Sequence, residues 1–86
     1  MQIIILDGNR MTDREEAHCY LKQALCLPEY YGCNLDALYD CLTDYGDCPV
    51  IFLEHADAID PYGDLLLKVF KDAAATGSIR FAVLPE

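Results

Sequence analysis

Two short, unbroken apolar runs most constrain what this chain can fold into. One covers residues 2–6 and the other residues 49–53, with a proline at its first position, where a strand tolerates it. Neither run alternates between apolar and polar side chains, so each suits a strand buried on both faces, as in a parallel sheet. A third apolar segment, residues 79–84, predicts the last strand.

Helical patterns separate these runs, as parallel strands require. Thr12 and Glu15 have the spacing of a capping box, which predicts a helix over about residues 13–25. Its apolar face consists of Ala17, Tyr20, Leu21, Ala24 and Leu25. Asn34 is suited to cap a second helix over about residues 35–44.

The remaining helical signals complete the fold prediction. Asp60 and Pro61 suit the N-cap and first position of a third helix that runs to about residue 75, and residues 55–59 suit one short helical turn. This order predicts an α/β fold, a three-stranded parallel sheet packed with three or four helices. Because 86 residues support one hydrophobic core but not two, we expect a single domain over residues 1–86.

The charge balance excludes several kinds of direct partner. The formal net charge is −9 and the sequence pI is about 4.3. Nucleic acids and anionic membrane surfaces need a basic footprint, so we expect neither as a direct partner. No apolar stretch approaches the roughly 20 residues of a membrane span. The acidic surplus instead favours a cationic partner, whose encounter it would steer.

The cysteines favour a reducing compartment. They are Cys19, Cys26, Cys33, Cys41 and Cys48. An odd number of cysteines, with no secretory signal before them, fits a cytoplasmic protein better than a disulfide scaffold. Their spacing matches no zinc template, so we expect no metal or other cofactor. His18 and His55 have no convincing cysteine or serine partner, so we expect a protein that is not an enzyme.

The segment of residues 27–42, LPEYYGCNLDALYDCL, carries an arrangement that folding does not require. Its predicted helix places Asp36 and Asp40 one turn apart, where like charges repel by roughly 0.2–0.5 kcal/mol. Asp44 lies near the helix C-terminus, where the dipole favours cations. No lysine or arginine lies between positions 22 and 68. We therefore expect the counter-charge to come from outside the chain.

The same segment resembles the barstar family of intracellular ribonuclease inhibitors. The matching residues are Leu27, Pro28, Glu29, Tyr30, Tyr31, Gly32, Asn34, Leu35, Asp36, Ala37, Leu38, Asp40, Cys41 and Leu42. They fill nearly every position of the segment, and weaker similarity spans the rest of the chain. The family fold, a three-stranded parallel sheet with helices, agrees with the periodicity. The resemblance implies a monomeric inhibitor that plugs the active site of a small, basic, extracellular-type ribonuclease of the guanyl (barnase-like) class.

The resemblance also implies which residues contact the partner. A ribonuclease active site is basic because it binds RNA phosphates, and carboxylates at fixed spacing on a helix can occupy the phosphate positions. Asp40 is implied as the central phosphate-mimicking carboxylate, with Asp36 beside it. The other implied contacts are Tyr30, Gly32, Asn34, Tyr39, Thr43, Asp44, Tyr45 and Asp72. Of the neighbours Tyr30 and Tyr31, we expect one in the core and one at the interface.

The chain departs from the family pattern in ways that concern the identity of the partner. Tyr39 and Tyr45 stand where the best-known members have tryptophans, which keeps aromatic surface anchors of another shape. Asp72 replaces a longer glutamate. Asp44 replaces a small residue and adds a charge. The segment of residues 49–70 is several residues shorter.

Other interpretations stay open from the sequence. Asp36 and Asp40 also fit an ordinary solvated helix face, and Asp72 fits an i,i+4 pair with Lys68. A second function is a divalent-cation site made by Asp36, Asp40 and Asp44, because hard cations prefer oxygen ligands. A third is a barstar-like module that binds some other basic protein or toxin.

Overall fold

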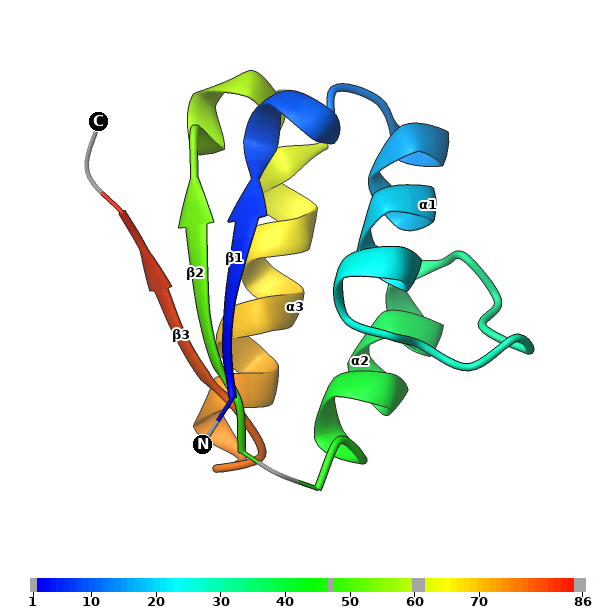
Figure 1. Cartoon of the computed structure of the whole chain (residues 1–86), viewed down its shortest axis with the longest axis vertical. Coiled ribbons are helices and arrows are strands. Elements are labelled where there is room, and N and C mark those ends of the chain that lie inside the picture. Colours follow the sequence, from blue (N-terminus) through cyan, green and yellow to red (C-terminus); the bar gives the residue numbers. More distant parts are fainter. Residues whose placement is uncertain (1, 47, 60–61, 85–86) are drawn as a thin grey trace.

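The computed structural model describes residues 2–46, 48–59 and 62–84, and at its centre is a parallel sheet in the order β1-β2-β3 (Figure 1). The strands are β1 (Ile3–Asp7), β2 (Val50–Glu54) and β3 (Arg80–Val83), and the helices are α1 (Arg14–Ala24), α2 (Leu35–Thr43) and α3 (Gly63–Ala75). Short 3-10 turns at Gly8–Arg10 and Ala56–Ile59 follow β1 and β2. The predicted α/β fold with three parallel strands is confirmed, as is the short turn after the second strand.

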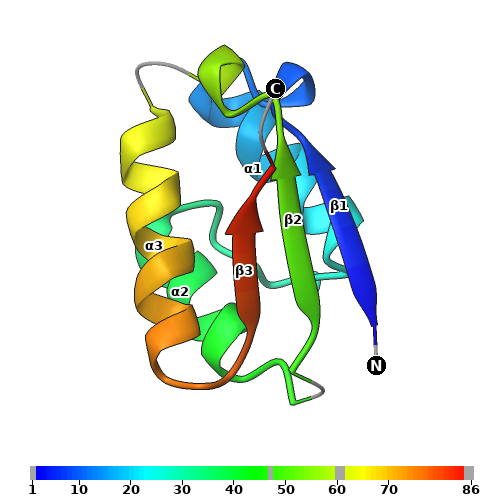
Figure 2. The same ribbon diagram turned by 90° about the vertical axis from the view of Figure 1, so that its left-hand side faces the viewer.

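The helices pack on one face of the sheet and enclose the core there (Figures 1 and 2). The buried side chains of β1 and β2 on this face are Ile4, Leu6, Ile51 and Leu53. From α3 the buried side chains are Leu66, Phe70 and Ala73. The Phe70 ring stacks on that of Phe81 in β3, with centroids 4.8 Å apart and planes 12° from parallel. Phe81 thereby closes the β3 end of the core.

The opposite face of the sheet is open, so the prediction that the first apolar run is buried on both faces was wrong. Ile3 and Ile5 are 62% and 55% exposed, whereas Ile4 between them is buried. Figure 2 looks onto this face, with the helices lying behind and beside the sheet. A chain this short uses its three described helices to cover one face. The β-branched residues of the outer face therefore reflect strand preference rather than burial.

The cap of α1 lies one residue later than the capping-box spacing predicts. Asp13, not Thr12, is the N-cap, and its Oδ1 accepts a hydrogen bond from the Glu16 N–H at 2.8 Å. Glu16, not Glu15, reaches back before the helix, and its Oε1 accepts from the N–H and hydroxyl of Thr12, the residue before the N-cap, at 3.3 and 3.1 Å. Two carboxylates therefore satisfy donors at the helix start, where the dipole favours negative charge.

α1 ends in a left-handed residue that is not glycine. Cys26 has a φ of 53°. The N–H of Leu27 donates to the Lys22 carbonyl at 2.9 Å, and that of Cys26 to the Gln23 carbonyl at 3.3 Å. These two bonds form a Schellman motif. The chain then enters residues 27–34, called here the protruding segment, which extends beyond α1 and α2 at the right of Figure 1.

The third helix is described from Gly63, after Tyr62, whose side chain makes no capping hydrogen bond. Its predicted start at Asp60 and Pro61 lies outside the described residues. α3 packs beside α2 and against the sheet. No described helix is both long enough and apolar enough to cross a membrane.

A Cys26→Gly substitution should raise the free energy of unfolding by about 1 kcal/mol, because a non-glycine residue in the left-handed region carries a penalty of roughly that size. Cys19→Gly is the matched control. It removes the same thiol from an exposed position inside α1, where glycine should lower stability by about 0.5 kcal/mol. Urea unfolding under reducing conditions measures both. A destabilised Cys26→Gly protein would contradict the argument from strain.

Candidate functional site

Buried leucines decide which way α2 presents its acids. Leu38 and Leu42, one turn apart, have no exposed surface. Asp36 and Asp40, also one turn apart, fall on the opposite side of the helix and are exposed. Packing the leucine stripe into the core therefore turns a carboxylate pair toward solvent.

Asn34 fixes the start of α2, as its sequence position predicts. Its Oδ1 accepts a hydrogen bond from the Ala37 N–H at 2.7 Å, and its Nδ2 donates to the Gly32 carbonyl at 3.3 Å. A Cβ on residue 32 would lie 3.1 Å from that Nδ2, so Gly32 leaves room for the cap. Asp36 lies in the first turn, where the helix dipole favours its charge.

The other end of α2 is electrostatically unfavourable. The Thr43 hydroxyl donates to the carbonyls of Tyr39 and Asp40 at 3.0 and 3.1 Å. Asp44 is the C-cap, and the last turn of α2 holds no basic residue. The carboxylate of Asp44 thus faces the negative end of the dipole. No described residue forms an ion pair with Asp36, Asp40 or Asp44.

The thiol of Cys41 responds to this negative charge. Burial raises its pKa above the ordinary 9.0, and Asp40 and Asp44 raise it further.

The cation-site alternative lacks a suitable geometry, because the described residues contain no group of three or more His, Cys, Asp or Glu side chains placed to hold a metal ion. The acids of α2 are spread along the helix rather than arranged around one point.

The tyrosines of the predicted site divide between core and surface. Tyr31 is 6% exposed and Tyr30 is 86% exposed, which confirms that one is in the core and one is not. Tyr39 and Tyr45 are partly buried and pack against the core. The Tyr45 hydroxyl donates to the Leu25 carbonyl at 2.7 Å. One side of each ring is therefore fixed against the core. The sequence predicted surface anchors, and the structure shows rings that are only partly at the surface.

Two depressions join predicted site residues from different elements. The first, of about 340 Å³, is lined by Cys26, Leu27, Pro28, Tyr30, Cys41, Asp44 and Tyr45. The second, of about 520 Å³, is lined by Arg14, Asn34, Leu35, Asp36, Tyr62 and Leu65. Three residues of this group were not predicted, because they come from other parts of the chain: Arg14 from α1, Leu65 from α3, and Tyr62 from the position immediately before α3. The half-exposed Leu65 extends the surface around Asp36 with an apolar edge.

Asp72 stands apart from these groups. It is exposed on α3 and does not line the two depressions beside α2. Lys68 and Asp72, both described, form no ion pair, so the alternative of a simple i,i+4 pair is not realised. A contact between Asp72 and the partner stays a prediction that follows from the family resemblance.

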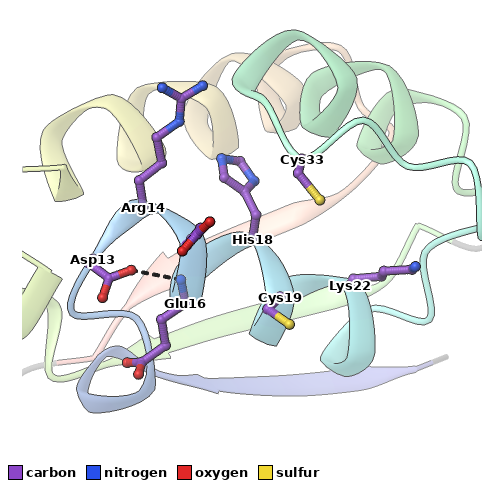
Figure 3. Close-up of a pocket in the computed structure, with 8 residues that line it drawn as sticks. Asp13, Arg14, Glu16, His18, Cys19, Lys22 and Cys33 are labelled. Atoms are coloured by element: carbon purple, nitrogen blue, oxygen red, sulfur yellow. Dashed lines mark hydrogen bonds between the residues drawn. The ribbon is translucent and has the colours of Figure 1, made fainter.

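Sequence reasoning missed His18, which is 1% exposed. Its Nδ1 lies 2.5 Å from the Tyr31 hydroxyl and its Nε2 lies 2.8 Å from the Tyr62 hydroxyl. Figure 3 shows the ring leaving α1 toward the other helices, beside a depression of about 800 Å³. The signal was present, because position 18 shares the helical stripe of the buried Leu21 and Leu25.

Acid should destabilise the protein through His18. Burial lowers the pKa of His18 below its ordinary 6.5, and the nearby Arg14 guanidinium lowers it further. The unfolded chain therefore binds the proton more readily, so this stabilisation is complete above about pH 6.5 and is lost as the pH falls below it. Urea unfolding from about pH 7.5 to about pH 5 should show a decline that His18→Gln reduces. Equal declines in both proteins would contradict this assignment.

Loss of the α2 cap should be measurable. Asn34→Ala is expected to lower the free energy of unfolding by about 1 kcal/mol, because the Ala37 N–H loses its acceptor. Asn34→Asp is the control, since a carboxylate keeps the acceptor and suits the dipole. Thermal and urea unfolding compare the two. An Asp variant as destabilised as the Ala variant would show that the amide acts through its Nδ2 instead.

Comparison with known proteins shows similarity over the full or nearly the full length of the chain. Residues 1–84 match the family model described as Barstar (barnase inhibitor). Over 91 aligned positions that cover 100% of both chains, the chain is 36% identical to a protein of Bacillus subtilis (strain 168) named Putative ribonuclease inhibitor YrdF. The matched range includes every strand and helix described above, and it includes the whole candidate site.

Proposed function

The chain belongs to the barstar family, and on that premise we propose that it inhibits a small basic ribonuclease of the guanyl, barnase-like type. The single observation that carries the proposal is the α2 carboxylate pair, Asp36 and Asp40. Both are exposed on one helix face, and neither is paired with a described residue. The proposed mechanism is occlusion: α2 enters the active site, and its carboxylates take the places of RNA phosphates.

The chemistry of the pair suits a phosphate-binding site. Side chains four residues apart on a helix have Cβ atoms about 5–6 Å apart, so Asp36 and Asp40 can engage two neighbouring cationic groups. Carboxylates accept bidentate hydrogen bonds from arginine, which add geometric selectivity to charge. Because Leu38 and Leu42 hold the helix in place, little order has to be gained on binding.

The surrounding residues supply the rest of the proposed interface. Tyr30 projects almost fully into solvent and provides a large, rigid contact. Thr43 and the exposed sides of Tyr39 and Tyr45 flank the acids, and Gly32 and Asn34 border them on the other side. Asp72 adds a carboxylate from α3. In this proposal the protein acts as a monomer in the cytoplasm on a ribonuclease of extracellular type, and it has no catalytic activity of its own.

Asp44 bears on which basic protein is bound. Its charge, which forms no ion pair with a described residue, lies at the unfavourable end of α2, and Asp44 lines the same depression as Tyr30 and Tyr45. A partner with a cationic side chain opposite this depression would relieve that charge. The second candidate function, binding of another basic protein or toxin, is favoured by this same observation.

Replacement of Asp40 should be the most damaging single change to inhibition. Asp40→Ala leaves a cationic group of the enzyme buried and unpaired, which costs about 3 kcal/mol or more and weakens binding over a hundredfold. Asp57→Ala, an exposed acid in the turn after β2, is the control and should bind like the parent protein. Titration of a purified guanyl-type ribonuclease, followed by activity and by calorimetry, measures both affinities.

The same titration can contradict the proposal in two ways. If the parent protein neither inhibits nor binds the enzyme, the ribonuclease proposal is wrong. If Asp40→Ala and Asp57→Ala have equal, small effects, the site assignment is wrong. Association with the parent protein should also slow as salt is added, because screening weakens the attraction between an acidic inhibitor and a basic enzyme.

A further inference from the structure

The middle of the protruding segment is held to the body of the protein by the buried side chain of Tyr31, whereas Leu27, the other buried side chain of the segment, lies at its start, just after the end of α1. Tyr30, Gly32 and Asn34, which flank Tyr31, all belong to the proposed interface. The Tyr31 N–H donates locally to the Pro28 carbonyl at 2.9 Å, which shapes the turn but does not attach it to a helix or strand. The side chain of Tyr31 makes that attachment, because it is buried and meets His18 of α1.

His18 extends this attachment to a third element. Its Nε2 is hydrogen-bonded to the hydroxyl of Tyr62, the residue immediately before α3. The rings of Tyr31 and Tyr62 lie 5.8 and 5.7 Å from the His18 ring, centroid to centroid. A neutral imidazole has one donor and one acceptor, and each hydroxyl can serve in either role, so both ring nitrogens are satisfied. The result is one hydrogen-bonded chain, Tyr31–His18–Tyr62, through the interior.

We infer that His18 and Tyr62 are positioning residues for ribonuclease binding, because the Tyr31–His18–Tyr62 chain holds the protruding segment in its binding conformation. The inference rests on the proposed function. Anchoring Tyr31 inward leaves the neighbouring Tyr30 outward, at 86% exposure. It also places Asn34 at the start of α2. A segment released from this anchor would have to be ordered during binding, which weakens affinity.

The surroundings of the three hydrogen-bonded side chains, Tyr31, His18 and Tyr62, keep them neutral. Burial raises the pKa of Tyr31 and of Tyr62, so both remain hydroxyls. Tyr31 and Tyr62 contact the His18 ring, and the charged or titratable groups that line the same depression as His18 are Asp13 at the N-cap of α1, Arg14, Glu15, Glu16, Cys19 and Lys22 on α1, and Cys33 in the protruding segment. Arg14 is the neighbour whose charge most disfavours a protonated ring. Acidification is therefore expected to loosen the segment.

The test compares conservative variants for binding to the ribonuclease. Tyr31→Phe and Tyr62→Phe each remove one hydroxyl from the chain and should bind about tenfold more weakly. His18→Gln keeps one donor and one acceptor but cannot titrate, so it should bind within about twofold of the parent near pH 7.5. Tyr20→Phe is the matched control. Its hydroxyl accepts from the Asp7 N–H at 3.0 Å, away from the protruding segment, so its loss should not alter binding.

A pH series separates positioning from general stability. The dissociation constant of the parent, divided by that of His18→Gln, should be near one at about pH 7.5 and should rise severalfold as the pH falls below about 6.5. Titration of the enzyme affects both proteins equally, so it cancels in this ratio. Circular dichroism and urea unfolding establish that each variant is folded at every pH used. A ratio that stays at one overturns the inference.

The outcomes also distinguish this inference from the proposed function. A parent protein that binds no ribonuclease overturns both. If the parent binds and Asp40→Ala weakens binding over a hundredfold, while Tyr31→Phe and Tyr62→Phe bind as well as Tyr20→Phe, only the positioning role is overturned. Should one of the phenylalanine variants fail to fold, the other and the pH ratio of His18→Gln still decide the question.

Discussion

The rotation of α2 about its axis is set by two buried leucines, Leu38 and Leu42, and the surface chemistry of the protein depends on it. If α2 were rotated about its axis by the angle between successive residues, Asp36 or Asp40 would move toward the core. An unpaired charge there is far more costly than an exposed leucine. Burial of the two leucines therefore determines that the carboxylates point to solvent, although the leucines lie on the opposite side of the helix. The cap at Asn34 then fixes where along the chain the helix begins.

The acids of α2 repel one another in the isolated protein, and none of them belongs to the buried core. Asp36 is well placed for the helix dipole, but it repels Asp40, and Asp44 has no compensating cation in the last turn. A net charge of −9 adds a general self-repulsion. Surfaces kept for binding commonly trade stability for function in this way.

Much of the fold could be predicted because its determinants are local. Strand and helix positions follow from short apolar runs and helical periodicity, and the cap at Asn34 follows from one residue type. The open face at Ile3 and Ile5 could not be predicted, because the supply of helices to cover a sheet is a property of the whole chain. The shift of the α1 cap from Thr12 to Asp13 was a choice between adjacent residues that are both good caps.

The candidate site was predictable where the acids alternate with buried leucines, and less so where distant residues meet. The sequence indicated that one of Tyr30 and Tyr31 is buried, but which one depends on His18, 13 positions before Tyr31. Tyr62 lies 44 positions from that histidine. No local pattern joins such residues, because only the packing of α1 beside the start of α3 brings them together.

Nearly all the candidate binding residues come from one uninterrupted stretch, residues 30–45, which lies between β1 and β2. Of the contacts that the family resemblance implies, Asp72 alone comes from elsewhere in the chain. The sheet, α3 and most of the core are built from other segments, so selection for folding and selection for a partner act largely on different parts of the gene. Substitutions within this one crossover can therefore alter the candidate binding surface, while the rest of the scaffold changes under the separate requirement that it continue to pack.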